Sequence, residues 1–127
     1  MCQHARENRW SENSRSSYKT AYSSWVEFCR VAKVQSNCRH DSGKLWSVQE
    51  TVEQVNAYIA VQCGMRGMHP LSIKKTYLPG IKATFTIRRE TNNFENAVAS
   101  RDVKLVLEGC AKVYLRMHPV SQNACLW

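Results

Sequence analysis

Apolar residues recur at the spacing of an α-helix in four segments of the chain, and stretches rich in polar and turn-forming residues separate these segments. The first segment runs from about Ser14 to Lys33. Its apolar residues follow the pattern i, i+4, i+7, i+8, i+11, i+14 and so share one helix face: Tyr18, Tyr22, Trp25, Val26, Cys29 and Ala32. No apolar–polar alternation is long enough for a strand, so the pattern predicts an all-α fold.

The second predicted helix has a well-defined start. Ser47 precedes Glu50 by three residues, a pair typical of a capping box, in which each side chain accepts a hydrogen bond from the other residue's backbone N–H. Gly64 is expected to cap the far end. Glu50 and Glu53 resemble a catalytic carboxylate pair, but first-turn carboxylates are better explained by the helix dipole. The residues expected to face inward are Val48, Val52, Val55, Tyr58, Ile59 and Cys63.

The third segment, Leu71 to Arg89, places an apolar stripe beside a basic one. The residues at four-residue steps share the face expected to be buried: Ile73, Tyr77, Ile81 and Phe85. The residues at seven-residue steps share a cationic face: Lys75, Lys82 and Arg89. No acidic residue follows Lys74 until Glu90, which favours a polyanionic partner. Pro79-Gly80 interrupts the segment, and because proline removes a backbone hydrogen bond we expect a kink or a split into two short helices.

The fourth segment runs from Ser100 to about Met117, and Pro119 ends it. The side expected to face inward holds Val103, Val106, Leu107, Cys110, Val113 and Tyr114, and the side expected to face solvent holds Arg101, Lys104, Lys112 and Arg116. Loops are expected at 35–46, 64–70 and 90–99. The predicted organisation is therefore a flexible N-terminal tail over 1–13, a helical domain over 14–118 and a C-terminal tail over 119–127.

The net charge of the chain and its distribution indicate which class of partner to expect. The 127 residues carry 18 Lys and Arg against 10 Asp and Glu, a net charge of +8. Residues 1–70 have nine basic and six acidic groups, whereas residues 71–127 have nine basic and four acidic groups. The C-terminal half is therefore the better candidate for contacts with phosphates. The alternative is that these charges only keep a small domain soluble.

The location is expected to be intracellular: the nucleus in a eukaryote, or the cytoplasm and nucleoid in a bacterium. No apolar run is long enough to span a bilayer, and the first ten residues lack the apolar stretch of a signal peptide. The six cysteines are therefore expected to be reduced, with Cys29, Cys63 and Cys110 as core residues. Two Cys-x-His pairs, starting at Cys2 and Cys38, could hold zinc, but their spacing is not that of structural zinc sites. We predict no metal and no cofactor.

Sequence motifs for catalysis are absent. The chain has no glycine-rich phosphate loop, no His-Glu-x-x-His and no Gly-x-Ser-x-Gly. Its aromatic residues could stack on bases, but most of them follow the period of an apolar helix face, which favours a role in the core. The sequence itself thus predicts a binding domain rather than an enzyme.

Three segments together resemble the N-terminal core-binding, or SAM-like, domain of tyrosine recombinases and phage integrases. Residues 17–29, SYKTAYSSWVEFC, are similar to the family's first helix. Residues 71–82, LSIKKTYLPGIK, are similar to its third helix, where a Ser-x-x-Thr-Ile-x-x-Tyr-Leu-x-x-Ile pattern is usual. Residues 103–110, VKLVLEGC, resemble its last helix. The likeness covers about 14–118, and its order and spacing follow the family.

The resemblance implies a four-helix orthogonal bundle that clamps one face of duplex DNA during DNA integration or recombination. In this family a separate C-terminal domain carries the catalytic residues, so the chain as given is expected not to be an enzyme. Residues 119–127 would then be a tail or the start of a truncated interdomain linker. The expected partners are double-stranded DNA and other protomers of a recombinase assembly on DNA, with no membrane.

We expect the DNA contacts to be phosphate contacts of weak sequence selectivity. The residues predicted to make them are Arg15, Lys19, Lys74, Lys75, Lys82, Arg89, Arg101, Lys104 and Lys112. Neutralising about four to six phosphates would give a log–log salt slope near −4 to −5. Two other readings remain open: a helical protein-interaction module with an acidic partner, and an inactive remnant of a mobile element.

Overall fold

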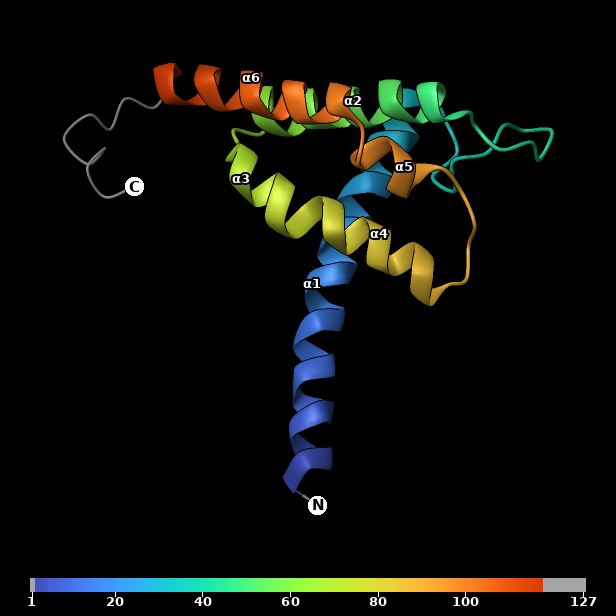
Figure 1. The fold of residues 1–127 in the computed structure, drawn as a ribbon, viewed down its shortest axis with the longest axis vertical. Helices are drawn as coiled ribbons and strands as arrows, with labels where there is room; N and C mark the ends of the chain where they lie inside the picture. Colours follow the sequence, from blue (N-terminus) through green and yellow to red (C-terminus); the bar gives the residue numbers. More distant parts are fainter. Residues whose placement is uncertain (1, 118–127) are drawn as a thin grey trace.

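The longest helix, α1, spans Cys2–Ala32, and its C-terminal half supplies the centre of the core. The computed structural model describes the backbone of residues 2–117 and the side chains of residues 17–116. Figure 1 shows the N-terminal half of α1 extending well beyond the helices that pack on the other half. The expected start at Ser14 is thus wrong, because α1 is already helical from Cys2.

Trp25 of α1 is fully buried at the centre of an aromatic cluster. Its ring lies 5.5 Å from that of Tyr58 and 5.3 Å from that of Phe94, measured between centroids. Its indole N–H donates to the carbonyl of Ser36, 2.9 Å away, so the ring's one polar group is satisfied. The same burial raises the pKa of Tyr58 to about 12, despite the Ser24 hydroxyl 2.6 Å from its phenol oxygen. The core positions of Trp25 and Tyr58 confirm the prediction, whereas Phe94 comes from a segment expected to be a loop.

The buried face of α1 differs in detail from the expected one. Val26 and Ala32 are exposed, whereas Ala21 and Phe28 are buried. The inward face is therefore centred on Trp25 and shifted away from Val26. The loop that follows folds back on itself through a single bridge between Arg39 and Leu45. It places Trp46 in the core.

Helix α2 spans Val48–Gly64, and its predicted start is confirmed. The Ser47 hydroxyl accepts from the backbone N–H of Glu50 at 3.0 Å, and the Glu50 carboxylate accepts from that of Ser47 at 2.9 Å. The bond from the Ser47 N–H, together with a second hydrogen bond from the His40 ring, holds the pKa of Glu50 below its usual value. Four of the predicted inward residues are buried: Val52, Val55, Tyr58 and Ile59. Val48 is exposed, and Gln62 is buried.

A continuous helix over Pro70–Ile87 consists of α3 (Pro70–Ser72), the π-helical turn η1 (Ile73–Tyr77) and α4 (Leu78–Ile87). In an ordinary α-helix the ring of Pro79 would clash with the carbonyl of Lys75 and leave it without a donor. The widened turn before Pro79 accommodates this, since the Leu78 N–H donates to the Ile73 carbonyl five residues back. Of the two expected outcomes, a kink or a split, the split is wrong: the helix continues through Pro79-Gly80, and its irregularity is the π-helical turn that precedes Pro79.

The widened turn changes which side chains the Pro70–Ile87 helix buries. Ile73 and Leu78, five residues apart, are both buried, and Ile81 and Phe85 follow at ordinary helical spacing. Tyr77, which the sequence pattern placed inward, is only half-buried. The prediction of Tyr77 in place of Leu78 assumed an uninterrupted α-helix.

Gly80 lies where α4 crosses α1. A Cβ atom at this position would lie 2.7 Å from the Cβ of Ala21, closer than two carbons can approach, and 3.6 Å from the Cα of Tyr18. Glycine therefore permits the two helices to pack at this distance. The Pro-Gly pair that looked like a helix breaker instead shapes a close helix crossing.

Two helices complete the domain. A short helix, α5 (Phe94–Val98), lies in the connection expected to be a loop, and it contributes Phe94 and Ala97 to the core. Helix α6 (Arg101–Met117) packs mainly along α2 and also touches α3 and α5. Of its predicted inward residues, Val103 and Leu107 are buried, whereas Val113 is half exposed. Figure 1 shows α6 beside α2, with α1 steeply inclined to both.

Over residues 2–117 the molecule is a small all-α domain of about five helices, four of which have seven residues or more. Within residues 2–117 there is no strand. In that same range, no helix combines the length and the apolar character needed to cross a membrane.

Candidate nucleic-acid interface

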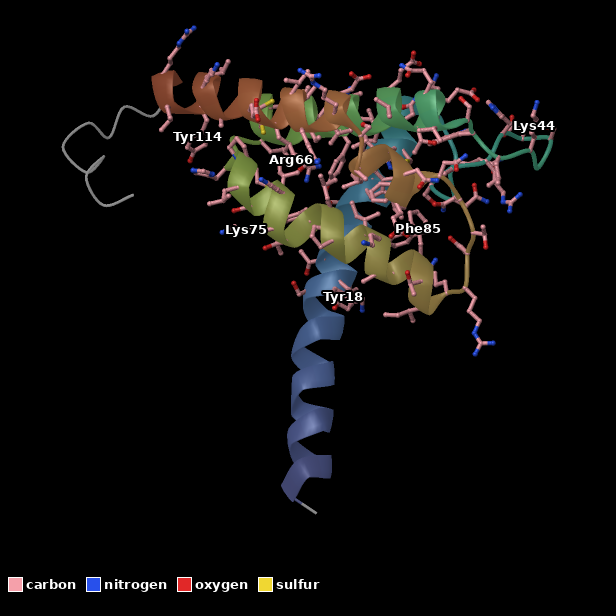
Figure 2. The ribbon with its side chains drawn as sticks, viewed as in Figure 1. Tyr18, Lys44, Arg66, Lys75, Phe85 and Tyr114 are labelled. Carbon is pink, nitrogen blue, oxygen red and sulfur yellow. The ribbon has the colours of Figure 1, made fainter. Side chains whose placement is uncertain are left out.

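Three exposed lysines stand on two elements that pack against each other. Lys19 lies on α1, and Lys74 and Lys75 lie on η1, which contacts α1. Among the described side chains, none of the three has a carboxylate within ion-pair distance. We call Lys19, Lys74 and Lys75 the α1–η1 cationic surface. Figure 2 places Lys75 on the outer side of its helix, with Lys44 at the opposite end of the molecule.

The η1 turn also decides whether the predicted basic stripe is straight. An extra residue in one turn rotates the positions on its two sides by up to about 100° relative to each other. Lys74 and Lys75 lie inside this turn, and Lys82 lies beyond it in α4. The seven-residue spacing of Lys75 and Lys82 therefore does not align them as it would in a regular helix.

Lys82 differs from these lysines in having an acidic partner. Its Nζ lies 3.4 Å from a carboxylate oxygen of Glu95, the second residue of α5. The two side chains remain 49% and 69% exposed, so the ion pair is open to solvent. The expectation of a basic stripe without acidic neighbours is therefore wrong at this position. Glu95 is distant in sequence, and the unexpected helix α5 brings it to Lys82.

Arg88 and Arg89 end the Pro70–Ile87 helix in two different ways. The Arg88 guanidinium lies 4.5 Å from the ring centroid of Tyr22 and within 3.4 Å of its hydroxyl, which fixes it against α1. Arg89 is exposed and adopts a left-handed conformation, with φ +57°, that closes the helix. Arg88 is therefore held against α1, although both arginines are exposed.

Helix α6 carries the remaining predicted contacts, Arg101, Lys104 and Lys112, and all three are exposed. Glu108 stands between the two lysines at i, i+4 steps from each, so the basic row on this helix contains a carboxylate. Helix α6 packs chiefly on α2, whereas α1 packs on α4 and η1. The structure thus divides the predicted residues between two parts of the molecule. Arg15 lies in α1, and its side chain falls outside the described residues.

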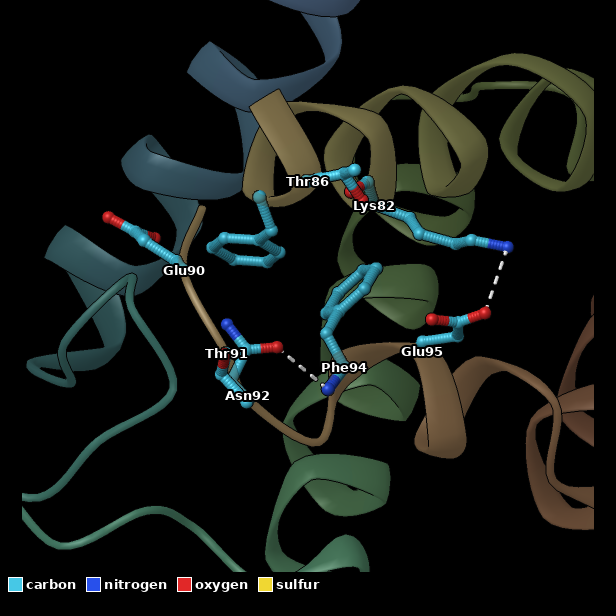
Figure 3. A pocket seen from close by; sticks show the side chains of 8 residues that line it. Lys82, Thr86, Glu90, Thr91, Asn92, Phe94 and Glu95 are labelled. Carbon is cyan, nitrogen blue, oxygen red and sulfur yellow. Dashed lines mark hydrogen bonds and ion pairs between the residues drawn. The ribbon is translucent and has the colours of Figure 1, made fainter. Parts of the chain in front are cut away.

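A shallow pocket of about 220 Å³ opens beside the Lys82–Glu95 pair (Figure 3). The rings of Phe85 and Phe94 line it, and the Asn92 side chain accepts a hydrogen bond from the backbone of Phe94 at 3.0 Å. The Asn92 carbonyl and the Lys82–Glu95 pair are thus engaged in contacts within the protein. We find no arrangement here of a nucleophile with a base.

The Cys-x-His pair that falls in the described part of the chain is separated by the fold. Cys38 is buried, whereas the His40 ring pairs with Glu50, its Nε2 2.9 Å from the carboxylate. Burial raises the pKa of the Cys38 thiol to about 12. Among the described residues there is no cluster of three or more side chains that could ligate a metal. The other pair, at Cys2 and His4, has side chains outside the described residues.

Arg66, in the turn after α2, is a cation that the sequence analysis did not single out (Figure 2). The Arg30 guanidinium, 2.6 Å away, holds the pKa of Glu27 below its usual value, and Arg66 contributes a further attraction. No spacing in the sequence links Arg66 to Glu27, so this relation could be found only from the fold.

Comparison with known proteins adds no identification. No protein-family model, no curated protein and no solved structure matches this chain. The geometry of the described residues therefore has to carry the functional argument by itself.

Proposed function

We propose that this chain is a non-catalytic DNA-binding module that contacts the phosphates of duplex DNA. The α1–η1 cationic surface is the observation that carries this proposal, because its lysines are exposed and have no acidic partner among the side chains of residues 17–116. A lysine already paired with a carboxylate would displace fewer counterions from the DNA and would therefore contribute less to affinity. The proposed footprint is therefore Lys19, Lys74 and Lys75, with Arg89 at its edge. Arg101, Lys104 and Lys112 on α6 become secondary contacts.

The finer architecture belongs to the same proposal. Four longer helical units, with α1 steeply inclined to α2 and α6, are compatible with the orthogonal, SAM-like core-binding domain of tyrosine recombinases (Figure 1). In that setting the module would hold DNA, other protomers would bind neighbouring sites, and a separate domain would perform strand exchange. The roles in DNA integration and recombination rest on the resemblance.

Charge reversal at matched positions tests the footprint. Lys74→Glu/Lys75→Glu should lower the affinity for a fluorescent duplex about tenfold or more at low salt and reduce the log–log salt slope by about 2. The control is Lys33→Glu/Lys44→Glu, which makes the same charge change at exposed lysines outside the proposed footprint. Fluorescence anisotropy at two or more salt concentrations measures both. Equal losses in the two variants would show that only net charge matters and would overturn the proposed footprint.

A protein-interaction module with an acidic partner is the second candidate, and one observation favours it. Leu105 and Val113 on α6 are each about half exposed, so this helix presents apolar side chains that a protein partner would cover. A competition experiment separates the two functions. Duplex DNA should displace a labelled acidic peptide if the phosphate footprint exists, and the displacement should be lost in Lys74→Glu/Lys75→Glu. A peptide that remains bound in excess duplex would favour the protein partner.

A further inference from the structure

Two of the cysteines meet between α2 and α6. Cys63 lies in the last turn of α2, and Cys110 lies near the middle of α6. Both are half-buried and pack against the edge of the core, and the two helices run side by side (Figure 1). The Cys110 side chain acts on the Cys63 thiol, which makes the two side chains neighbours across the α2–α6 contact.

We propose that Cys63 and Cys110 form a reversible oxidation site, at which a low-molecular-weight disulfide such as oxidised glutathione joins the two thiols in a disulfide between α2 and α6. Two neighbouring thiols on packed helices become linked once their sulfur atoms approach to the S–S bond length of about 2.05 Å. The surroundings permit this approach, because both side chains sit at the margin of the core. The proposal does not depend on DNA binding.

The reaction proceeds by two thiol–disulfide exchanges. One cysteine loses its proton and attacks a sulfur of the oxidised glutathione, which breaks the glutathione S–S bond and releases one glutathione thiolate. The second cysteine then loses its proton and attacks the cysteine sulfur of the mixed disulfide, releasing the second glutathione. The released thiolates take up the two protons. Two protein thiols are thereby oxidised and one glutathione disulfide is reduced.

The protonation of Cys63 sets the rate of this reaction. Burial, together with the adjacent Cys110 thiol, raises the pKa of Cys63 to about 12, so little thiolate is present at neutral pH. Oxidation is therefore expected to be slow near pH 7 and to accelerate as the pH rises. The pair would thus respond to sustained oxidation rather than to brief exposure.

Cys29 and Cys38 provide an internal control. Cys29 is 1% exposed and Cys38 is fully buried. The two side chains are neighbours, because Cys29 adds to the effect of burial in raising the pKa of Cys38. They are thus two neighbouring thiols that glutathione cannot reach in the folded protein. Under the same conditions they should remain reduced. A difference between the two pairs would reflect position and access rather than cysteine chemistry in general.

Peptide mapping of the full-length protein tests the proposal directly. Trypsin places each of the six cysteines on a separate peptide, with Cys63 in residues 45–66 and Cys110 in residues 105–112. The protein is incubated with oxidised glutathione at pH 8, quenched with acid, unfolded, alkylated and digested. We expect the 45–66 and 105–112 peptides to appear cross-linked and two hydrogens lighter. The peptides that hold Cys29 and Cys38 should be alkylated.

Variants supply the second readout. In a Cys2→Ser/Cys125→Ser background, oxidation should raise the melting temperature by about 5 °C or more, because the cross-link closes the loop from α2 to α6. Further replacement of Cys110 by Ala or Ser should abolish this rise, and dithiothreitol should reverse it. Glutathione adducts on Cys63 or Cys110 without a cross-link, or equal oxidation of Cys29 and Cys38, would overturn the proposal. The mapping of the wild-type chain decides the matter even if a variant fails to fold.

Discussion

The crossing of α1 with α4 and the contact between α2 and α6 are built in different ways. At the first, Gly80 removes a side chain so that the helices approach closely, and Ile81 and Trp25 are fully buried beside it. At the second, Cys63 and Cys110 are half-buried, and Leu105 on the outer side of α6 is 51% exposed. The close crossing therefore fixes how α1 and α4 pack, whereas the looser α2–α6 contact is the one at which we propose a covalent change.

The largest expected difference between the two regions is in the free energy of unfolding. Ile81→Ala should lower it by about 2 to 5 kcal/mol, because it removes a fully buried side chain in a site that cannot collapse easily. Leu105→Ala on α6 should change it by less than about 1 kcal/mol, since half of that side chain already faces water. Urea unfolding followed by circular dichroism measures both. Similar losses would contradict the proposed difference in packing.

A structural feature of this molecule can be predicted from the sequence when the residues that determine it lie close together along the chain. The capping box at Ser47 was predicted correctly because both partners lie three residues apart and act through one helix turn. The π-turn before Pro79 changes the helical period, so Leu78 is the fully buried residue, while Tyr77 is only partly buried against the core. Short α5 was missed because five residues give too little periodicity to recognise.

The candidate site follows the same division. Exposure of Lys19, Lys74 and Lys75 could be predicted from their positions opposite the apolar residues. The pairing of Lys82 with Glu95 could not, because it requires α5 to place Glu95 beside α4. Charge patterns along the sequence therefore indicate which helices are basic, but only the fold identifies which cations are neutralised.

A smaller effect, but one of opposite sign in the two regions, is expected from replacing glycines. Gly80→Ala should destabilise the protein by about 1 to 3 kcal/mol, because the new Cβ would overlap Ala21. Gly109→Ala on α6 meets nothing within 4 Å and should stabilise it by about 0.5 to 1 kcal/mol through helix propensity. Ala21→Gly should partly rescue Gly80→Ala, as thermal melts of the single and double variants would show. If Gly80→Ala were stabilising, the close crossing would be wrong.

The smallest expected effect concerns the two carboxylates that lie among the predicted DNA contacts. Glu95→Gln should release Lys82 from its ion pair and raise affinity for duplex DNA by about two- to fivefold at low salt, if the DNA lies along the α1–η1 side. Glu108→Gln makes the same charge change between Lys104 and Lys112 on α6 and should have less effect. Because the exposed pair contributes about 1 kcal/mol or less to stability, both variants should melt near the wild-type temperature. Affinity titrations at low and moderate salt compare them. The two variants have the same net charge and differ only in where the carboxylate is lost. A larger gain in affinity from Glu108→Gln would therefore indicate that the DNA contacts α6 instead of the α1–η1 cationic surface.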